Sequence, residues 1–465
     1  MDSRGKIRPF GFRDKLGYLF GDFGNDFTFL LSSSFLLKFY TDVMGVNAAA
    51  VGAVMMVARF IDGFTDVAMG RICDESRYTR HGKFKPWILR MSGPVAISSF
   101  LIYQSSLAPM PQWAKIAYLF VTYILWGSVF YTSVNIPYGS MASAVSGNPS
   151  DRQSLSTYRT MGGILAGAFV TAVVPIVVYD NIGGKEVMNG RRFTMVAGVC
   201  SALAVICYIL CYTLTTDRVR VDRASRDDRD NHIFALIKSS IHNRPLISII
   251  AASIVMLLSQ LTMQQMINYV YPNVYGNAAV QSVATLTMVG GMILAAAISK
   301  PVVNRFGKAE VSIASNFFAG IMILLLFFIR PDNVWVYVAF QTAAWIGLGV
   351  FSMVSWALIT DVIDYSEIRN GVREDGSVYA LYSFARKLGQ AASSGLTGIL
   401  LSVIGYSEET AFDSSVMRGI FNISTLVPGV GLIILSLILW LWYPLKKKQV
   451  EENVEILRRK RESSD

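Results

Sequence analysis

Residues 47–70 are NAAAVGAVMMVARFIDGFTDVAMG, an apolar stretch that carries Asp62 and Asp66 together with Arg59. In a helix, residues four positions apart lie on one face, so the two carboxylates point the same way one turn apart. An unpaired carboxylate in hydrocarbon costs several kcal/mol, and such residues in a membrane helix usually serve a function. The stretch therefore predicts a membrane helix in which a further group offsets the energetic cost of burying the two acids.

The whole chain has the composition of a membrane protein. Of its 465 residues, 53% are hydrophobic and 16% are charged, and the mean hydropathy is +0.43. Apolar runs of about 20 residues, long enough to cross a bilayer as a helix, recur along the chain. These numbers exclude a water-soluble protein and predict an all-α polytopic membrane protein.

Apolar windows predict twelve spans, six on each side of one long polar segment. The predicted spans are 16–40, 47–70, 87–107, 113–145, 159–180, 193–215, 244–271, 279–299, 309–329, 333–363, 377–403 and 416–443. The corresponding domains are a six-helix bundle over 1–216, a cytoplasmic linker over 217–243, a second six-helix bundle over 244–445 and a basic cytoplasmic tail over 446–465.

Lysine and arginine predict the orientation of the chain. They gather at the N-terminus, in the 71–90 loop, in the linker, in the 300–308 loop and in the tail, and the 180–192 loop is the exception on the other side. By the positive-inside rule both termini are cytoplasmic, as expected for a multi-pass protein of the plasma (inner) membrane. The net charge of +10 then reflects topology and contact with membrane lipids, and it does not indicate nucleic-acid binding.

Polar residues from four spans are predicted to share one layer of the membrane. At a rise of about 1.5 Å per residue, they come out between the cytoplasmic boundary and the midplane. They are Asp22, Asp26, Asp62, Asp66, Asn135 and Lys387. Arg59 alone cannot neutralise the four acids, so the sequence indicates a site for H⁺ or Na⁺.

Three further positions carry specific expectations. Lys38 lies near the outer end of span 1 and is expected to extend its ammonium to the membrane surface. Arg159 lies near the cytoplasmic end of span 5, and two interpretations stay open: the same extension, or a place in the polar layer. Gly70 in the loop after span 2 is expected to let two helix ends approach closely, as part of a gating loop with Asp74.

Several segments resemble the glycoside–pentoside–hexuronide:cation symporter family of the major facilitator superfamily, which includes melibiose and glucuronide permeases. They are GYLFGDFGNDF, YTDVMGV, RFIDGFTDVAMGRICD, HGKFKPW, NIPYGSMA, ITDVIDYSE and YSFARKLGQA, spread between residues 16 and about 405. The resemblance implies a major facilitator fold and transport of a sugar with a cation by alternating access. It also implies that Asp62, Asp66 and Thr132 bind the cation, that Asp26 and Arg159 contact the sugar, and that Lys387 is the family's charged residue on span 11. Arg59 joins the predicted cation site as the helical neighbour of the two acids.

Two departures from melibiose permease concern the sugar pocket. Asn135 replaces an acid, and Gly139 replaces a tryptophan, so a galactoside preference should not be transferred. The amide at position 135 also replaces a charged ligand by a neutral one, which weakens Na⁺ coordination, whereas a proton needs a single carboxylate. H⁺ is therefore the favoured coupling ion, and Na⁺ at Asp62, Asp66 and Thr132 remains the alternative.

Arg386 and Lys387 are neighbours on span 11 and point about 100° apart. Lys387 is expected to pair with the acids of spans 1 and 2 in the empty state. Arg386 has two interpretations: it binds a uronate carboxylate through both ends of its guanidinium, or it packs against a neighbouring helix. Together with Asp22, Asp26, Asn135 and Arg159, these residues form the predicted substrate site.

The sequence thus predicts a secondary symporter that imports a small glycoside, pentoside or hexuronide. It requires no cofactor and no metal other than the coupling ion, and it has no GxxxxGK[ST] loop for ATP. An enzyme is not expected, because the chain lacks a Ser/His/Asp set and a histidine-rich metal site. The alternatives are a Na⁺-coupled oligosaccharide or pentoside symporter and a lipid carrier on the same scaffold.

Overall fold

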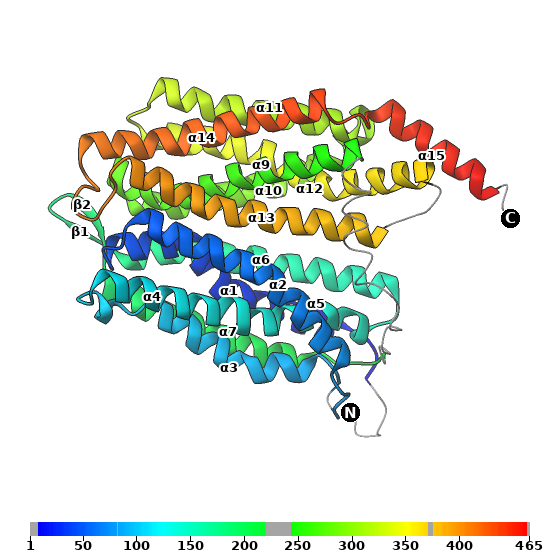
Figure 1. The fold of residues 1–465 in the computed structure, drawn as a ribbon, viewed down its shortest axis with the longest axis horizontal. Helices are drawn as coiled ribbons and strands as arrows, with labels where there is room; N and C mark the ends of the chain where they lie inside the picture. Colours follow the sequence, from blue (N-terminus) through cyan, green and yellow to red (C-terminus); the bar gives the residue numbers. More distant parts are fainter. Residues whose placement is uncertain (1–7, 81, 220–242, 371–374, 463–465) are drawn as a thin grey trace. The chain divides into compact units, whose positions relative to one another are not determined.

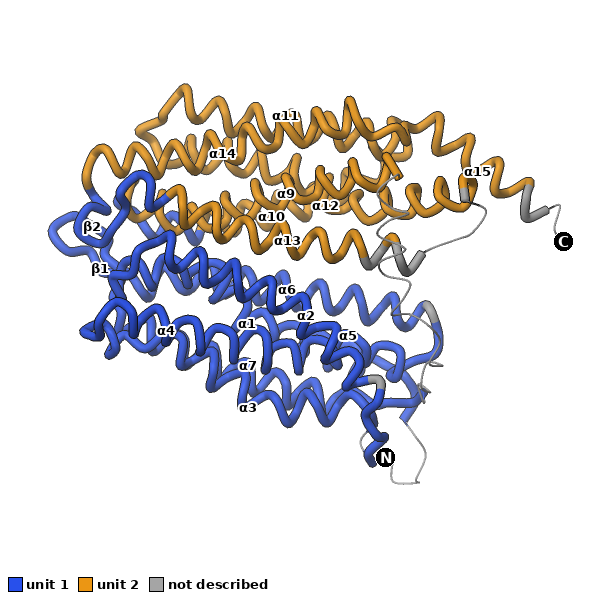
Figure 2. Tube along the Cα trace, viewed as in Figure 1, with its two compact units in different colours: residues 1–225, 276–282, 401–412 blue, residues 226–275, 283–400, 413–465 orange. Residues whose placement is uncertain are grey.

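The protein is a set of long helices in two compact units (Figures 1 and 2). The computed structural model describes residues 8–80, 82–219, 243–370 and 375–462. Unit 1 comprises residues 1–225, 276–282 and 401–412, and unit 2 comprises the rest of the chain. The predicted linker falls almost entirely on 220–242, outside the described residues.

Unit 1 contains the first six predicted spans. Its helices are α1 (Phe12–Asp42), α2 (Ala48–Glu75), α3 (Lys85–Ile102), a short 3₁₀ turn (Ser105–Leu107), α4 (Gln112–Ile124), a π-helical segment (Leu125–Tyr131), α5 (Thr132–Val145), α6 (Pro149–Val178) and α7 (Gly190–Leu214). The segments from α4 to α5 are continuous and form the fourth span. Between α6 and α7 the chain forms an antiparallel hairpin of β1 (Tyr179–Ile182) and β2 (Lys185–Met188), which the sequence did not predict.

Unit 2 contains the other six spans. Its helices are α9 (Arg244–Tyr269), a π-helical turn (Val270–Val274), α10 (Ala278–Phe306), α11 (Lys308–Ile329), α12 (Val334–Asn370), α13 (Asp375–Val403), α14 (Ser414–Leu441) and α15 (Lys447–Glu462). Within the described residues, nine spans are long and apolar enough to cross a membrane, and the charge-bearing α1, α3 and α13 bring the total to the predicted twelve. Most of the predicted tail forms the helix α15.

Close helix packing in unit 1 centres on α1, which lies against α6 and α7. Tyr18 of α1 and Tyr138 of α5 stack with ring centroids 4.7 Å apart. Each hydroxyl donates to the backbone carbonyl of the other tyrosine, at 2.6 and 3.1 Å. These reciprocal bonds satisfy two buried hydroxyls in an apolar environment and fix α1 against α5.

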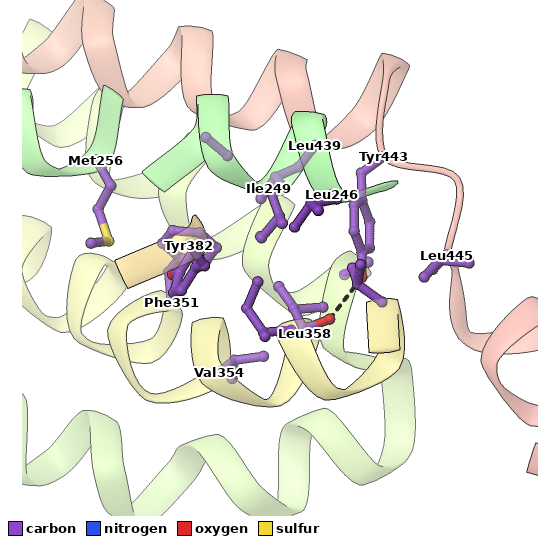
Figure 3. Packing of buried hydrophobic residues seen from close by; sticks show 14 of the residues in the cluster. Leu246, Ile249, Met256, Phe351, Val354, Leu358, Tyr382, Leu439, Tyr443 and Leu445 are labelled. Carbon is purple, nitrogen blue, oxygen red and sulfur yellow. Dashed lines mark hydrogen bonds between the residues drawn. The ribbon is translucent and has the colours of Figure 1, made fainter. Parts of the chain in front are cut away.

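The core of unit 2 is a cluster of buried apolar side chains from α9, α12, α13 and α14 (Figure 3). Phe351 and Leu358 of α12 and Tyr382 of α13 are fully buried in it. The Tyr443 hydroxyl donates to the Leu358 carbonyl at 3.4 Å. Side chains of this size each contribute roughly 1.5–3 kcal/mol when fully buried from water, although lipid-facing helices gain less.

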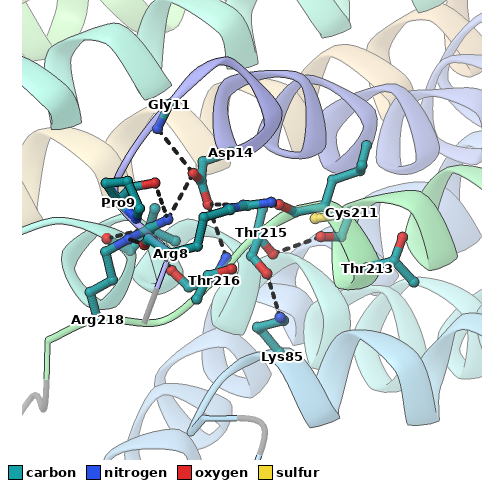
Figure 4. A network of polar contacts seen from close by, with 12 residues as sticks. Arg8, Pro9, Gly11, Asp14, Lys85, Cys211, Thr213, Thr215, Thr216 and Arg218 are labelled. Atoms are coloured by element: carbon teal, nitrogen blue, oxygen red, sulfur yellow. Dashed lines mark hydrogen bonds and ion pairs between the residues drawn. The ribbon is translucent and has the colours of Figure 1, made fainter. Parts of the chain in front are cut away.

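A polar network lies where α1 begins and α7 ends (Figure 4). The Asp14 carboxylate is fully buried and pairs with Arg8 and Arg218, each at 2.9 Å. It also accepts hydrogen bonds from the backbone N–H groups of Gly11 and Thr216. The two oxygens therefore satisfy four donors, and they join the start of α1 to the chain that follows α7.

Two expectations about single residues are wrong. Lys38 does not reach the membrane surface: its side chain is 1% exposed, and its ammonium pairs with Asp42 at 2.7 Å and donates to the Tyr406 hydroxyl at 2.6 Å. Asp42 and Tyr406 take the place of water around the Lys38 ammonium, so this side chain does not need to extend to the surface. At Gly70 an added Cβ would meet no described atom within 4 Å, so no close helix approach occurs there. The Asp74 side chain lies outside the described residues.

Candidate functional site

The two acids of α2 face hydroxyl groups on the fourth span. Asp62 accepts a short hydrogen bond from the Ser128 hydroxyl, and Asp66 accepts one from the Thr132 hydroxyl at 2.9 Å. The spacing of four residues is the same on both elements, so the acids and the hydroxyls match turn by turn. We call these four residues the acid–hydroxyl site.

Arg59 supplies positive charge to this site. Its guanidinium pairs with Asp62 at 3.2 Å, and both side chains are 14% exposed. The same guanidinium lies over the Phe29 ring of α1 at 4.9 Å, and that ring stacks on Tyr131 at 5.8 Å. Arg59 is thus fixed on α2 by Asp62 and by Phe29 of α1. It therefore does not neutralise all four acids predicted in the layer.

The π-helical segment explains how Ser128 reaches Asp62. In this segment the backbone hydrogen bonds join residues five apart instead of four, which rotates the side chains that follow. Such segments often occur at functional sites. Gly127 lies in this segment, and a Cβ there would be 3.6 Å from Asp62, so the backbone itself borders the acid. The sequence prediction missed Ser128, because the α-helical period does not hold across this segment.

The acid–hydroxyl site has the chemistry of a small-cation site. Carboxylate and hydroxyl oxygens are ligands for hard cations, and either carboxylate can instead carry a proton. The Gly127 carbonyl adds an oxygen, since it accepts from the Thr132 hydroxyl at 3.1 Å. The structure therefore places Asp62, Asp66, Thr132 and Arg59 together, as the sequence predicted, and adds Ser128.

A second group, the α1–α6 charge cluster, consists of Asp22 and Asp26 of α1 and Arg159 of α6. Arg159 Nε pairs with Asp22 Oδ1 at 3.0 Å. Both acids point at Gly163 of α6: a Cβ there would lie 2.7 Å from Asp26 Oδ2 and 3.0 Å from Asp22 Oδ2. The ion pair with Asp22 decides between the two interpretations of Arg159 and places it among the polar residues.

Asn135 belongs to a chain of amides and a tyrosine in unit 1. Its carbonyl oxygen accepts from the Asn25 amide at 3.4 Å, and the Asn25 oxygen accepts from the Tyr208 hydroxyl at 2.9 Å. Because Asn25 is 1% exposed, its orientation is fixed by this bond from α7. Among the described residues the Asn135 amide nitrogen has no acceptor, so it can donate to a sugar hydroxyl or a carboxylate. Asn25 and Tyr208 are positioning residues that the sequence prediction missed.

The remaining predicted residues lie on α13 in unit 2. The Arg386 guanidinium lies over the rings of Trp356 and Tyr382, at 5.5 and 5.8 Å. This stacking corresponds to the packing interpretation of Arg386. Lys387 is half-buried on the same helix. The expected pairing of Lys387 with the acids of unit 1 stays a prediction.

Comparison with known proteins places this arrangement in a family. The model of the MFS/sugar transport protein family matches residues 17–447. The chain belongs to this family. The match bears out the resemblance to the glycoside–pentoside–hexuronide:cation symporters and the predicted major facilitator fold. It also means that the chain is a multi-pass membrane transporter.

Two curated relatives and one solved structure show how far the likeness extends. The uncharacterized symporter YjmB of Bacillus subtilis is 31% identical over 454 residues, which cover 96% of this chain and 95% of the relative. The glucuronide carrier protein homolog of Escherichia coli is 31% identical over 451 residues, covering 97% and 96%. The crystal structure of the nucleoside transporter NupG is 14% identical with a TM-score of 0.62, covering 93% of this chain and 99% of NupG, and it shows the shared fold alone.

Adjacent glycines of α6 allow a test of the α1–α6 charge cluster. A Cβ at Gly162 would lie 2.4 Å from the Leu19 backbone oxygen, so Gly162→Ala must separate α1 from α6 and is expected to cost about 1–3 kcal/mol. Gly163→Ala would push only against the ends of Asp22 and Asp26, so it is expected to weaken substrate binding while thermal unfolding changes little.

Thermal unfolding in detergent and sugar binding by calorimetry would measure both effects. Gly167→Ala is the matched control, because its Cβ would make an ordinary 3.4 Å contact with Leu30. Equal losses of stability for Gly162→Ala and Gly163→Ala would show that the two acids do not occupy the position described.

Proposed function

We propose that the protein is a secondary symporter of the plasma membrane that imports a glycoside or hexuronide together with H⁺. Alternating access carries both solutes across, and both termini are cytoplasmic. The acid–hydroxyl site binds the coupling ion, and the α1–α6 charge cluster with Asn135 binds the sugar. Asp22 and Asp26 of α1 and Arg159 of α6 then contact the bound sugar.

The observation that carries the proposal is the pairing of Asp62 and Asp66 with Ser128 and Thr132. Two carboxylates one turn apart repel each other, and Arg59 is engaged by Asp62. Binding a cation lowers that repulsion, so the site favours a loaded state. An ion that is bound only together with substrate couples the two fluxes, since each changes the affinity for the other by the same factor.

The substrate class is supported by the polar groups of α1, α5 and α6. Arginine, carboxylates and an amide donor are the groups that fix sugar hydroxyls in a pocket. One relative is named a glucuronide carrier homolog and another a symporter. A glycoside or a hexuronide fits this set of groups, whereas a lipid carrier would require an apolar path for acyl chains.

Na⁺ is the second candidate for the coupling ion, and Ser128 favours it. The Ser128 hydroxyl and the Gly127 carbonyl add oxygen ligands that the sequence did not predict, and Na⁺ requires several oxygens in a defined shell. H⁺ remains the first candidate because Asn135 replaces an acid and a single carboxylate suffices for a proton.

Uptake by proteoliposomes would test the proposal. Labelled methyl β-D-glucoside and methyl β-D-glucuronide would be supplied with an imposed pH gradient or an imposed Na⁺ gradient, each with and without a protonophore. We expect accumulation that follows the pH gradient and collapses with the protonophore. Accumulation that follows the Na⁺ gradient and survives the protonophore would make Na⁺ the coupling ion, and absence of accumulation under both gradients would contradict symport.

A further inference from the structure

The α1–α6 charge cluster contains more negative than positive charge. Its two acids lie at most about 6 Å apart, because Asp22 Oδ2 and Asp26 Oδ2 both border one point on Gly163. Arg159 pairs with Asp22 through Nε. Within the part of the chain that the structure describes, Asp26 makes no ion pair or hydrogen bond. With both acids ionised, the cluster therefore carries a net charge of −1.

The Arg159 guanidinium keeps an edge for a second partner. Its side chain is 39% exposed, although it pairs with Asp22 and lies over the Tyr138 ring at 5.2 Å. A Cβ at Gly139 would lie 3.7 Å from Arg159 Nη1, so the absence of a side chain there leaves this nitrogen uncovered. A planar guanidinium with an uncovered edge binds a carboxylate through two parallel hydrogen bonds.

A carboxylate at that edge would lie beside Asp22 and Asp26. Three negative groups around one guanidinium repel one another, and a shared proton removes that repulsion, as it does in other carboxylate pairs. The groups that interact electrostatically with Asp26 are Asp22 on α1, Tyr131 before α5, Arg159 on α6 and Tyr208 on α7. The phenols keep their protons below about pH 8 and the guanidinium keeps its charge, so the two acids are the groups of this set that can take up a proton.

We propose that the cluster binds the carboxylate of a hexuronide at Arg159 and takes up one proton on the Asp22–Asp26 pair as it does so. This inference rests on the proposed function and assigns its substrate class. The proton comes from the medium with the substrate and leaves with it on the other side. It is separate from the ion at the acid–hydroxyl site, whose residues lie on α2 and the fourth span.

The proposal predicts the same transported charge for a charged and a neutral sugar. A neutral glycoside crosses with one coupling cation and a net charge of +1. A hexuronide of charge −1 crosses with the same cation and the additional proton, so its net charge is also +1. With the coupling cation alone, hexuronide transport would carry no net charge and would not respond to the membrane potential.

Proton counting on the purified full-length protein provides the test. Methyl β-D-glucuronide and methyl β-D-glucoside differ only at C6, and calorimetry in two buffers of different ionisation enthalpy gives the protons bound with each sugar. We expect one more proton with the glucuronide than with the glucoside. In proteoliposomes, we expect an inside-negative potential without a pH gradient to accelerate uptake of both sugars.

Variants of Asp26 identify where the proton goes. In the wild type, the affinity for the glucuronide relative to that for the glucoside should fall about tenfold per pH unit above the apparent pKa of the pair. Asp26→Asn should remove this dependence and the additional proton, and Asp26→Glu should retain both. Affinity for the glucoside alone should depend on pH in the same way in the wild type and in Asp26→Asn.

Four outcomes would overturn the inference, and they differ in what they say about the proposed function. Equal proton counts for the two sugars, or binding of the glucoside alone, would overturn the inference and leave sugar symport intact. A ratio of glucuronide to glucoside affinity that keeps its pH dependence in Asp26→Asn would place the proton elsewhere. Absence of binding for both sugars and for other glycosides would contradict the proposed function itself.

Discussion

Asp66→Asn is expected to abolish accumulation of a neutral glycoside in proteoliposomes while exchange down a gradient persists. One coupled charge that crosses a potential of 100 mV supplies about 2.3 kcal/mol, which corresponds to about 50-fold accumulation. An amide at this position can neither take up a proton nor offer a charged oxygen to Na⁺. The groups on α1, α5 and α6 that we assign to the sugar are unchanged, so binding and exchange of the sugar should remain.

Three matched variants separate the roles within the acid–hydroxyl site. Thr132→Val removes the hydroxyl that donates to Asp66 at 2.9 Å but keeps both acids. It should weaken ion affinity without abolishing coupling. Ser128→Ala should act in the same way through Asp62. Asp62→Asn also removes the ion-pair partner of Arg59 and should lower the amount of folded protein. Full accumulation by Asp66→Asn would show that the coupling ion binds elsewhere.

The sequence predicted the fold and one face of this site because both depend on short-range patterns. Apolar windows of about 20 residues mark membrane helices, and acids four residues apart mark one helix face. Asp62 and Asp66 follow directly from that pattern. Ser128 does not, since its approach to Asp62 depends on the π-helical segment between α4 and α5, and a scan at the α-helical period contains no information on a widened turn.

Contacts between residues far apart in the sequence could not be predicted from these short-range patterns. Lys38 lies near the end of its span, which is all that the sequence shows, and its partner Tyr406 is separated from it by 368 positions. The depth estimate placed Asp22 and Asp26 in one layer but could not assign Arg159 to Asp22. A rise per residue gives depth and does not give the rotation of one helix relative to another.

The second large effect is expected at the start of α1, where Asp14→Leu should destabilise the protein by about 3–5 kcal/mol. The change leaves Arg8 and Arg218 without the carboxylate that each contacts at 2.9 Å (Figure 4). It also removes the acceptor of two backbone N–H groups, at Gly11 and Thr216. The loss should appear as a lower thermal unfolding temperature in detergent. Asp14→Asn should lose less, because an amide oxygen still accepts part of these bonds.

Substitution of Asp217, which lies close to the same network, should change the stability of the protein in the opposite direction. Its two carboxylate oxygens are buried, and burial outweighs the attraction of Lys85 and raises the pKa of this carboxyl from 3.8 to about 6. Because the folded state then holds the proton more tightly than the unfolded state, stability falls as the pH rises from about 4 to about 6 and stays lower above that range, by about 3 kcal/mol. Asp217→Asn should therefore raise the unfolding temperature at pH 7 and have no effect below about pH 4, whereas Asp14→Leu should lower it. An Asp217→Asn protein that is less stable than the wild type at pH 7 would mean that attraction to Lys85 outweighs the cost of burying the charge.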